Sequence, residues 1–152
     1  MGDTVFGVSL FGAYASELVV KAAFIRRVPA ALELTQAATF PVASSTAWYA
    51  LSELARIGPG QRVLVHSAAG GVGSALCQLA RAIGADALGV VGSAHKASTP
   101  RLKAPPRWST RAAKTYGNAR ALRTHGFDAV FDANGADTLH KAISTYARWD
   151  GW

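Results

Sequence analysis

Three short apolar stretches, bounded by turn-forming residues, predict buried β-strands over residues 62–66, 87–91 and 127–132. Segment 71–83 lies between the first two, and its apolar residues recur at the spacing of an amphipathic helix: Val72, Ala75, Leu76, Leu79, Ala80 and Ile83. Gly84 follows, where a helix commonly ends in a left-handed glycine. Strand, turn, helix and strand form a βαβ unit, which predicts an α/β fold with a doubly wound parallel sheet.

The chain before this unit has a different pattern. Residues 4–28, which include the β-forming run Tyr14–Val20, predict extended structure. A short helix is expected over 31–38 and a longer one over 44–57, because Pro41 separates two stretches with helical apolar spacing. The pattern thus predicts a β-rich start followed by two connecting helices.

A glycine-rich turn connects the first predicted strand of the βαβ unit to its helix. Dinucleotide-binding turns have the pattern Gly-x-Gly-x-x-Gly, which is matched here by Ala68-x-Gly70-x-x-Gly73. Gly70 would let a pyrophosphate approach the backbone, and Gly73 would let the helix pack against the strand. The positive end of the helix dipole would then face the phosphates. The alternative is a tight βα turn that binds nothing.

The end of the second strand indicates which dinucleotide would bind. NAD sites usually carry an acidic residue there for the ribose 2′-hydroxyl, about 20 residues after the turn. This chain has Ser93 and Lys96 and no acid, so the site favours the 2′-phosphate of NADP(H). The alternative for Lys96 is an ordinary solvated lysine after a strand.

Several blocks of sequence resemble one family in the same order: Gly2–Gly7, Gly12–Ala15, Pro41–Leu51, Gly58–Gly73 and Gly126–Asp132. Together they resemble the medium-chain dehydrogenase/reductase superfamily, in its zinc-free branch of quinone oxidoreductases of the zeta-crystallin type. The resemblance implies hydride transfer from NADPH to a quinone or an α,β-unsaturated carbonyl.

The resemblance also implies a domain organisation. Residues 1–30 would be the remnant of a GroES-like β domain, 31–60 connecting helices, and 61–152 an incomplete NADP-binding Rossmann domain. Within the last of these, residues 136–147 predict a further helix.

The family's cofactor-binding residues carry over to ten positions. Thr46 would lie near the nicotinamide, or else be a helix-surface or capping hydroxyl. The pyrophosphate loop would be formed by Ala69, Gly70, Gly71, Val72 and Gly73. Ser93 and Lys96 would bind the 2′-phosphate. Asn134 and Gly135 would pass the nicotinamide, or else form a simple Asn-Gly turn. No catalytic residue is identified.

The chain departs from the family over residues 97–115. Here a helix and an aliphatic strand are expected, but three prolines and no aliphatic run exclude an ordinary strand. Either compensating frameshifts or a real basic insertion would explain the segment.

Length is the other departure, because family members are roughly twice as long and carry a full substrate domain. We therefore expect a truncated reductase with little activity, or alternatively a non-enzymatic remnant that binds a dinucleotide weakly or not at all. Open strand edges in an incomplete sheet would favour a homodimer.

The net charge of +7 comes from one segment. No acidic residue lies between Asp86 and Asp128, while that interval holds Lys96, Arg101, Lys103, Arg107, Arg111, Lys114, Arg120 and Arg123. Nucleic-acid binding is a weaker alternative, because only Trp108 and Tyr116 are available there for base stacking. We expect no specific nucleic-acid partner.

Other chemistry finds little support. The four histidines lack metal-ligand spacing, so no metal site is expected. Cys77 is the only cysteine, which rules out an internal disulfide, and we interpret it as a small packing residue. No apolar run reaches the roughly 18 residues of a membrane span. A cytoplasmic location is expected.

Overall fold

The computed structural model describes residues 2–93, 107–110, 126–135 and 138. The chain forms two compact units, Met1–Ser45 and Thr46–Trp152. The first holds a small antiparallel pair of strands, and the second holds a parallel sheet. The predicted helix at 136–147 lies outside the described residues except for Thr138.

The first unit is built on two short strands, β1 (Val5–Gly7) and β2 (Ile25–Arg27), which pair antiparallel. A 3₁₀ turn, η1 (Ala22–Phe24), leads into β2. Both strands fall within the region predicted to be extended. The pair is compatible with a remnant of a β domain, and the GroES-like assignment stays a prediction.

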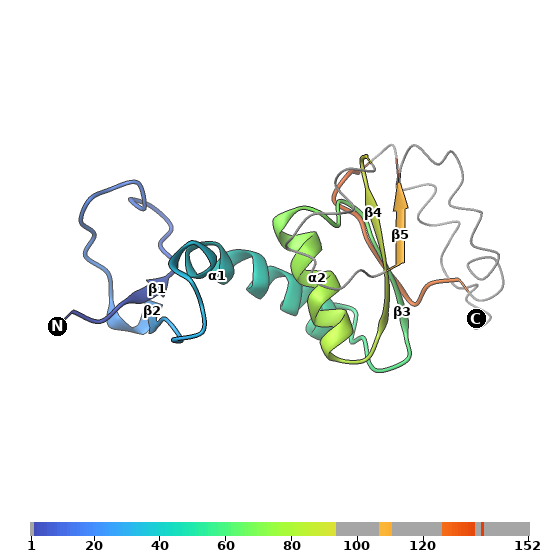
Figure 1. Cartoon of the computed structure of the whole chain (residues 1–152), viewed down its shortest axis with the longest axis horizontal. Coiled ribbons are helices and arrows are strands. Elements are labelled where there is room, and N and C mark those ends of the chain that lie inside the picture. Colours follow the sequence, from blue (N-terminus) through green and yellow to red (C-terminus); the bar gives the residue numbers. More distant parts are fainter. Residues whose placement is uncertain (1, 94–106, 111–125, 136–137, 139–152) are drawn as a thin grey trace. The chain divides into compact units, whose positions relative to one another are not determined.

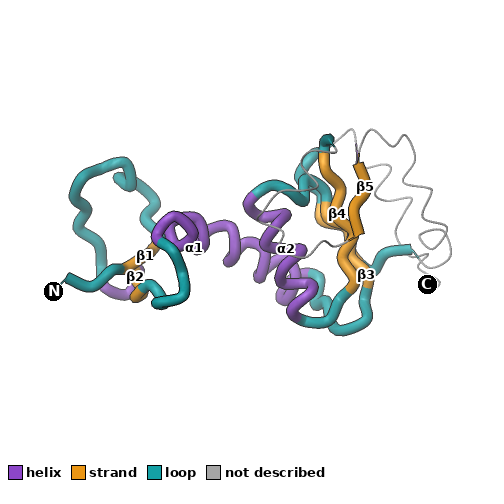
Figure 2. Tube along the Cα trace, in the orientation of Figure 1, coloured by secondary structure: helices purple, strands orange, loops and turns teal. Residues whose placement is uncertain are grey.

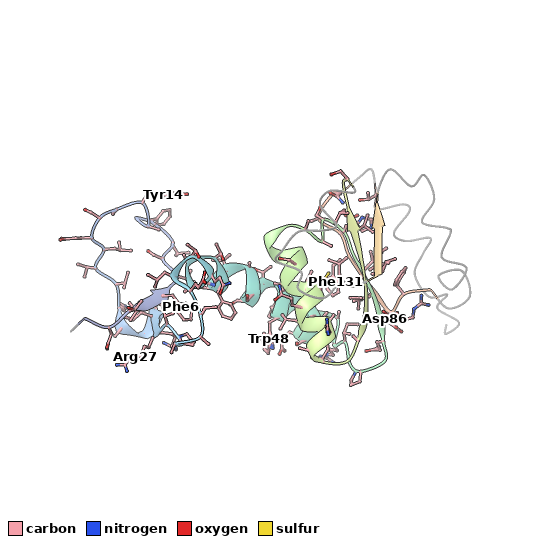
Figure 3. The ribbon with its side chains drawn as sticks, in the orientation of Figure 1. Phe6, Tyr14, Arg27, Trp48, Asp86 and Phe131 are labelled. Atoms are coloured by element: carbon pink, nitrogen blue, oxygen red, sulfur yellow. The ribbon has the colours of Figure 1, made fainter. Side chains whose placement is uncertain are left out.

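The expected extended run Tyr14–Val20 forms no strand, which corrects the prediction. Its side chains are exposed, with Tyr14 and Val19 fully accessible. Figure 3 labels Tyr14 on this loop. A β-forming sequence needs a paired neighbour to become a strand, and none lies beside this run in the described residues.

A single helix, α1 (Leu34–Trp48), replaces the two helices expected on either side of Pro41 (Figure 2). It passes directly into a π-helix, η2 (Tyr49–Leu54). A proline inside a helix removes one backbone hydrogen bond, which is why the sequence alone indicates a boundary there. Here Pro41 and Ala37, four residues before it, are both buried, so packing favours the continuous helix over the sequence-local preference.

The second unit contains a four-stranded parallel sheet in the order β5-β4-β3-β6 (Figure 1). The strands are β3 (Arg62–Val65), β4 (Asp86–Val91), β5 (Arg107–Thr110) and β6 (Ala129–Phe131). Helix α2 (Gly71–Ala82) connects β3 to β4. The predicted α/β fold with a parallel sheet and a βαβ unit is confirmed.

Strand β5 was not expected, because its sequence lies inside the Pro-rich segment 97–115. It pairs parallel with β4, from Leu88 opposite Arg107 to Val91 opposite Thr110. Parallel pairing uses backbone N–H and C=O groups, which every residue after Pro106 in this strand supplies. The exclusion of a strand from this segment was therefore wrong.

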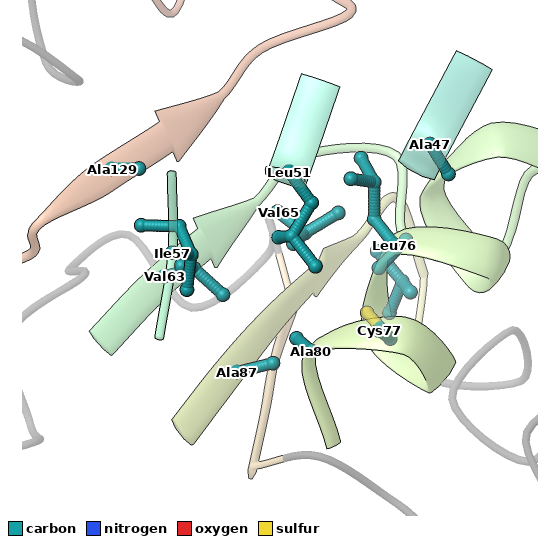
Figure 4. Close-up of a cluster of buried hydrophobic side chains, with 12 residues drawn as sticks. Ala47, Leu51, Ile57, Val63, Val65, Leu76, Cys77, Ala80, Ala87 and Ala129 are labelled. Atoms are coloured by element: carbon teal, nitrogen blue, oxygen red, sulfur yellow. The ribbon is translucent and has the colours of Figure 1, made fainter. Parts of the chain in front are cut away.

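A hydrophobic cluster fills the space between α2, η2 and the sheet (Figure 4). Helix α2 contributes Leu76, Cys77 and Ala80, which are at most 4% exposed. Val72, expected on this face, is 37% exposed instead. The buried stripe is thus rotated toward Cys77, because Gly73 rather than Val72 faces the strand at the start of the helix.

The amino-terminal edge of the sheet is closed by glycine-containing turns. Gly84 has φ +81, and its N–H donates to the Arg81 carbonyl while the Ala85 N–H donates to the Ala80 carbonyl. This pair of bonds is a Schellman ending, and Gly84 has the left-handed conformation that the sequence predicts for the residue after the helix. The Gly60 N–H donates to the Gly84 carbonyl at 2.9 Å, which joins the loops that precede β3 and β4.

Replacement of Gly84 by alanine is expected to destabilise the chain. A Cβ there would make an ordinary van der Waals contact with Pro59 Cβ at 3.5 Å and no clash, so the cost arises from the left-handed backbone. We expect a loss of about 1–2 kcal/mol in the free energy of unfolding, measured in urea. Gly92→Ala is the matched control, because Gly92 has no atom within 4 Å of its Cβ position. Equal stability of the two variants would contradict the expectation.

Candidate functional site

The glycine turn lies at the carboxyl end of β3, the edge at which open parallel sheets bind ligands. The Gly70 N–H donates to the Ser67 carbonyl at 2.8 Å, and the Ala68 N–H donates to the Val90 carbonyl at 3.1 Å. Gly70 is the N-cap of α2 and supplies no side-chain cap. Gly70, Gly71 and Val72 are exposed. The first turn of α2 therefore presents the positive end of its dipole to solvent.

Gly73 allows the helix to lie against the end of the strand. A Cβ at this position would lie 2.8 Å from Ala68 Cα and 2.9 Å from the Ser67 carbonyl carbon. Real Cβ atoms do not approach backbone atoms so closely, so no side chain fits here without moving the turn. This is the packing role that the sequence pattern assigns to the last glycine.

A polar cluster joins this turn to the end of β6. The Ser67 hydroxyl donates to Asn134 Oδ1 at 3.0 Å. The Asn134 N–H donates to Asp132 Oδ1 at 2.8 Å, and the Thr138 hydroxyl donates to Asp132 Oδ2 at 2.6 Å. Ser67 has φ +53, a left-handed conformation that is uncommon outside glycine.

The pKa of Asp132 lies below its ordinary value. Partial burial would raise it, but the hydrogen bonds from Thr138 and Asn134 and the charge of His66 outweigh that effect. His66 is buried directly after β3, and its backbone N–H donates to the Phe131 carbonyl at 2.8 Å. Asp132 therefore carries a negative charge beside the turn, and both carboxylate oxygens accept hydrogen bonds within the protein.

The structure brings together some of the ten expected residues. Ala69 to Gly73 form the turn, and Asn134 meets that turn through Ser67. Ser93 is half-buried just after β4, while Thr46 is exposed on α1 and Gly135 is exposed with φ +77. Lys96 lies outside the described residues. Cofactor contacts for all ten stay predictions.

Sequence reasoning missed Ser67 and Asp132. Asp132 had a usable signal, because it directly follows a parallel strand and so had to lie at the ligand-binding edge of the sheet. Ser67 had only a hydroxyl directly before the first position of the glycine pattern. Among the described residues, no group of three or more His, Cys, Asp or Glu side chains could hold a metal ion.

Asp132→Asn is expected to lower stability in a pH-dependent way. Because the folded-state pKa is below the unfolded-state value, the ionised carboxylate stabilises the fold above its ordinary pKa of 3.8, and that contribution is lost as the pH falls through the folded pKa. Urea unfolding of the wild-type chain and Asp132→Asn is measured at neutral pH and at about pH 2. The difference between their free energies of unfolding should be smaller at the acidic pH. A difference that widens in acid would contradict this sign.

Cys77 should react with thiol reagents only when the chain unfolds. It is 3% exposed, and burial raises the pKa of its thiol to about 12, so the reactive thiolate is scarce. Labelling at about pH 8 should be at least about 100-fold slower in the native chain than in guanidinium. Fast native labelling would mean that Cys77 is not a core residue.

Comparison with known proteins places this architecture in context. No family model matches the chain. It is 39% identical over 133 residues to polyketide synthase GfsB of Streptomyces halstedii and 31% identical over 162 residues to highly reducing polyketide synthase xilA of Penicillium rubens. These matches cover 88% and 97% of this chain but only 2% and 6% of the two synthases.

Solved structures match over nearly the whole chain. The quinone oxidoreductase of Escherichia coli complexed with NADPH superposes with a TM-score of 0.81 at 32% identity, over 97% of this chain and 46% of that one. The Thermus thermophilus quinone oxidoreductase gives 0.81 at 29% identity, over 93% and 46%. The nucleotide-binding subdomain of the PpsC enoylreductase domain from Mycobacterium tuberculosis gives 0.61 at 32% identity, over 72% and 63%.

The chain thus spans slightly under half of the quinone oxidoreductases that it matches. Their fold recurs here at 29% and 32% sequence identity. The resemblance of this chain to the medium-chain dehydrogenase/reductase family, with its quinone oxidoreductases and enoyl reductases, is therefore confirmed.

Proposed function

We propose that the chain supplies the NADP(H)-binding part of an oxidoreductase of the quinone or enone reductase type. The observation that carries this proposal is the exposed N-terminus of α2, which no side chain caps and which opens at the carboxyl edge of the parallel sheet. Backbone N–H groups aligned with a helix dipole suit a pyrophosphate, which carries negative charge and accepts several hydrogen bonds. The match to quinone oxidoreductase structures complexed with NADPH supports the same assignment.

The residues at the turn fit a dinucleotide in shape as well as in charge. Gly70 and Gly71 have no side chains to obstruct a phosphate, and the small side chain of Ala69 precedes them. Val72 is exposed rather than packed in the core, so it can contact a ligand without disturbing the helix. The bound cofactor would supply the hydride, and the protein would hold it at the edge of the sheet.

NADP(H) is proposed over NAD(H) because β4 ends without an acidic residue. After Val91 come Gly92 and Ser93, and the next basic residue is Lys96. The Ser93 hydroxyl can donate to a 2′-phosphate oxygen, and the Lys96 ammonium can neutralise its charge. A carboxylate in the same place would instead repel that phosphate.

The substrate is proposed to contain a polarised double bond. The curated relatives are polyketide synthases, and structural neighbours include the JamJ enoyl reductase, whose named reaction class acts on a carbon–carbon double bond conjugated to a carbonyl. These relatives favour an α,β-unsaturated carbonyl, with a quinone as the alternative acceptor. The quinone oxidoreductases extend well beyond the span that this chain covers, so we propose little turnover by the chain alone.

A non-enzymatic remnant is the competing function. A homodimer is proposed under either function, because large apolar side chains of the first unit are exposed, including Leu10, Phe11, Tyr14 and Val19. A cytoplasmic location is proposed on the single, buried cysteine. None of the described helices is long and apolar enough to cross a membrane.

NADPH is expected to raise the melting temperature of the purified chain more than NADH does. At a concentration about 100 times Kd, the stabilisation is about 2.7 kcal/mol, or roughly 5–10 °C. Ser93→Ala and Lys96→Ala should reduce the NADPH effect and leave the NADH effect unchanged, which makes NADH the internal control. A melt that neither cofactor shifts would favour the remnant.

A further inference from the structure

We infer that Ser67 and Asn134 form a tie that positions the glycine turn for dinucleotide binding. The inference rests on the proposed function. Asn134 would then act through Ser67, as a positioning residue, rather than by contact with the cofactor. Ser67 would be a second positioning residue, directly before the first position of the Ala68-x-Gly70-x-x-Gly73 pattern.

The bond between Ser67 and Asn134 extends the pairing of β3 and β6 beyond their last backbone hydrogen bond. Strands β3 and β6 pair from Val63 opposite Ala129 to Val65 opposite Phe131, and the His66 N–H still reaches the Phe131 carbonyl at 2.8 Å. From Ser67 on, the chain that leaves β3 makes no further backbone bond to β6 in the described residues, although the Ala68 N–H still donates to the Val90 carbonyl of β4 at 3.1 Å. The hydroxyl of Ser67 bonds there to Asn134 Oδ1 at 3.0 Å, across 67 residues of sequence. A side-chain bond thus holds the two chain segments together beyond the last backbone bond.

Ser67 needs such a restraint. Its φ of +53 is unfavourable for a residue with a Cβ and persists only where the surroundings impose it. In this conformation its carbonyl accepts the Gly70 N–H at 2.8 Å and lies where a side chain on Gly73 would have to be. The orientation of Ser67 therefore sets both the shape of the turn and the closeness of α2.

Asn134 is suited to act as the fixed end of the tie. Its N–H donates to Asp132 Oδ1, and Thr138 holds the other carboxylate oxygen. The Thr138 N–H also donates to the Gly135 carbonyl at 3.0 Å. The Asn134 Nδ2 is buried, so this nitrogen is not presented to solvent for a ligand. Because a hydroxyl both donates and accepts, either orientation of the amide keeps the contact with Ser67.

A double-mutant cycle tests the inference. NADPH affinity is measured by titration for the wild-type chain, Ser67→Ala, Asn134→Ala and the double variant. Each single change should weaken binding about 3- to 10-fold, and the double variant should be no weaker than either single one. Ser74→Ala is the matched control, since its hydroxyl donates to the Gly71 carbonyl within its own helix, and its Kd should stay within about twofold of wild type.

Two results would overturn the tie. Losses that multiply in the double variant would mean that Asn134 binds the cofactor on its own, and unchanged affinity in both single variants would mean that neither residue positions the turn. Should Ser67→Ala fail to fold, Ser67→Gly removes the hydroxyl while tolerating the positive φ, and takes its place in the cycle.

A second measurement separates this inference from the proposed function. Amide NMR shifts of Gly70 and Gly71 in the cofactor-free chain should move in the same way in both single variants. A wild-type chain that binds no NADPH would refute the proposed function, and the amide shifts would still decide on the tie. Unchanged glycine amides in both variants would refute the tie whether or not NADPH binds.

Discussion

The close approach of α2 to the end of β3 is the constraint on which the second unit depends. The space available at Gly73 is less than one methyl group, so the first turn of α2 packs directly against Ser67 and Ala68 in the turn after β3, and the helix dipole opens at the edge of the sheet. Leu76, Cys77 and Ala80 then follow at helical spacing and cover β3 and β4. The packing of α2 and the geometry of the proposed cofactor site thus both depend on the contact at Gly73, and a larger residue at this position would disturb both.

The polar residues at this edge have divided tasks. Among the described residues, no side chain caps the first turn of α2, whereas the side chains of Ser67, Asn134, Asp132 and Thr138 bond within one cluster. An ionised Asp132 beside the glycine turn would oppose the phosphate that we propose binds there if its charge were unshielded. Its two oxygens accept hydrogen bonds from Asn134 and Thr138, and His66 offsets part of its field.

The elements that sequence could predict are those whose signal is local. Strands β3, β4 and β6 are apolar runs, and α2 has helical spacing and a glycine at its end. Helix α1 required knowledge of burial at Pro41, which outweighs the loss of one hydrogen bond. Strand β5 depends on backbone pairing with β4, and its sequence contains no run of aliphatic residues that would predict a strand. The Ser67–Asn134 bond joins residues 67 positions apart, and no periodicity records it.

The joined loops at Gly60 and Gly84 lie at the opposite end of the sheet from the glycine turn. One end of the sheet is thus held by a backbone hydrogen bond between two loops, and the other end carries the glycine turn at which we propose that the cofactor binds. Substitutions in the loops that precede β3 and β4 would therefore change the stability of the chain and leave the proposed ligand preference unchanged. A recombinant form could accordingly be stabilised through the loops at residues 58–61 and 83–85 without redesign of the turn.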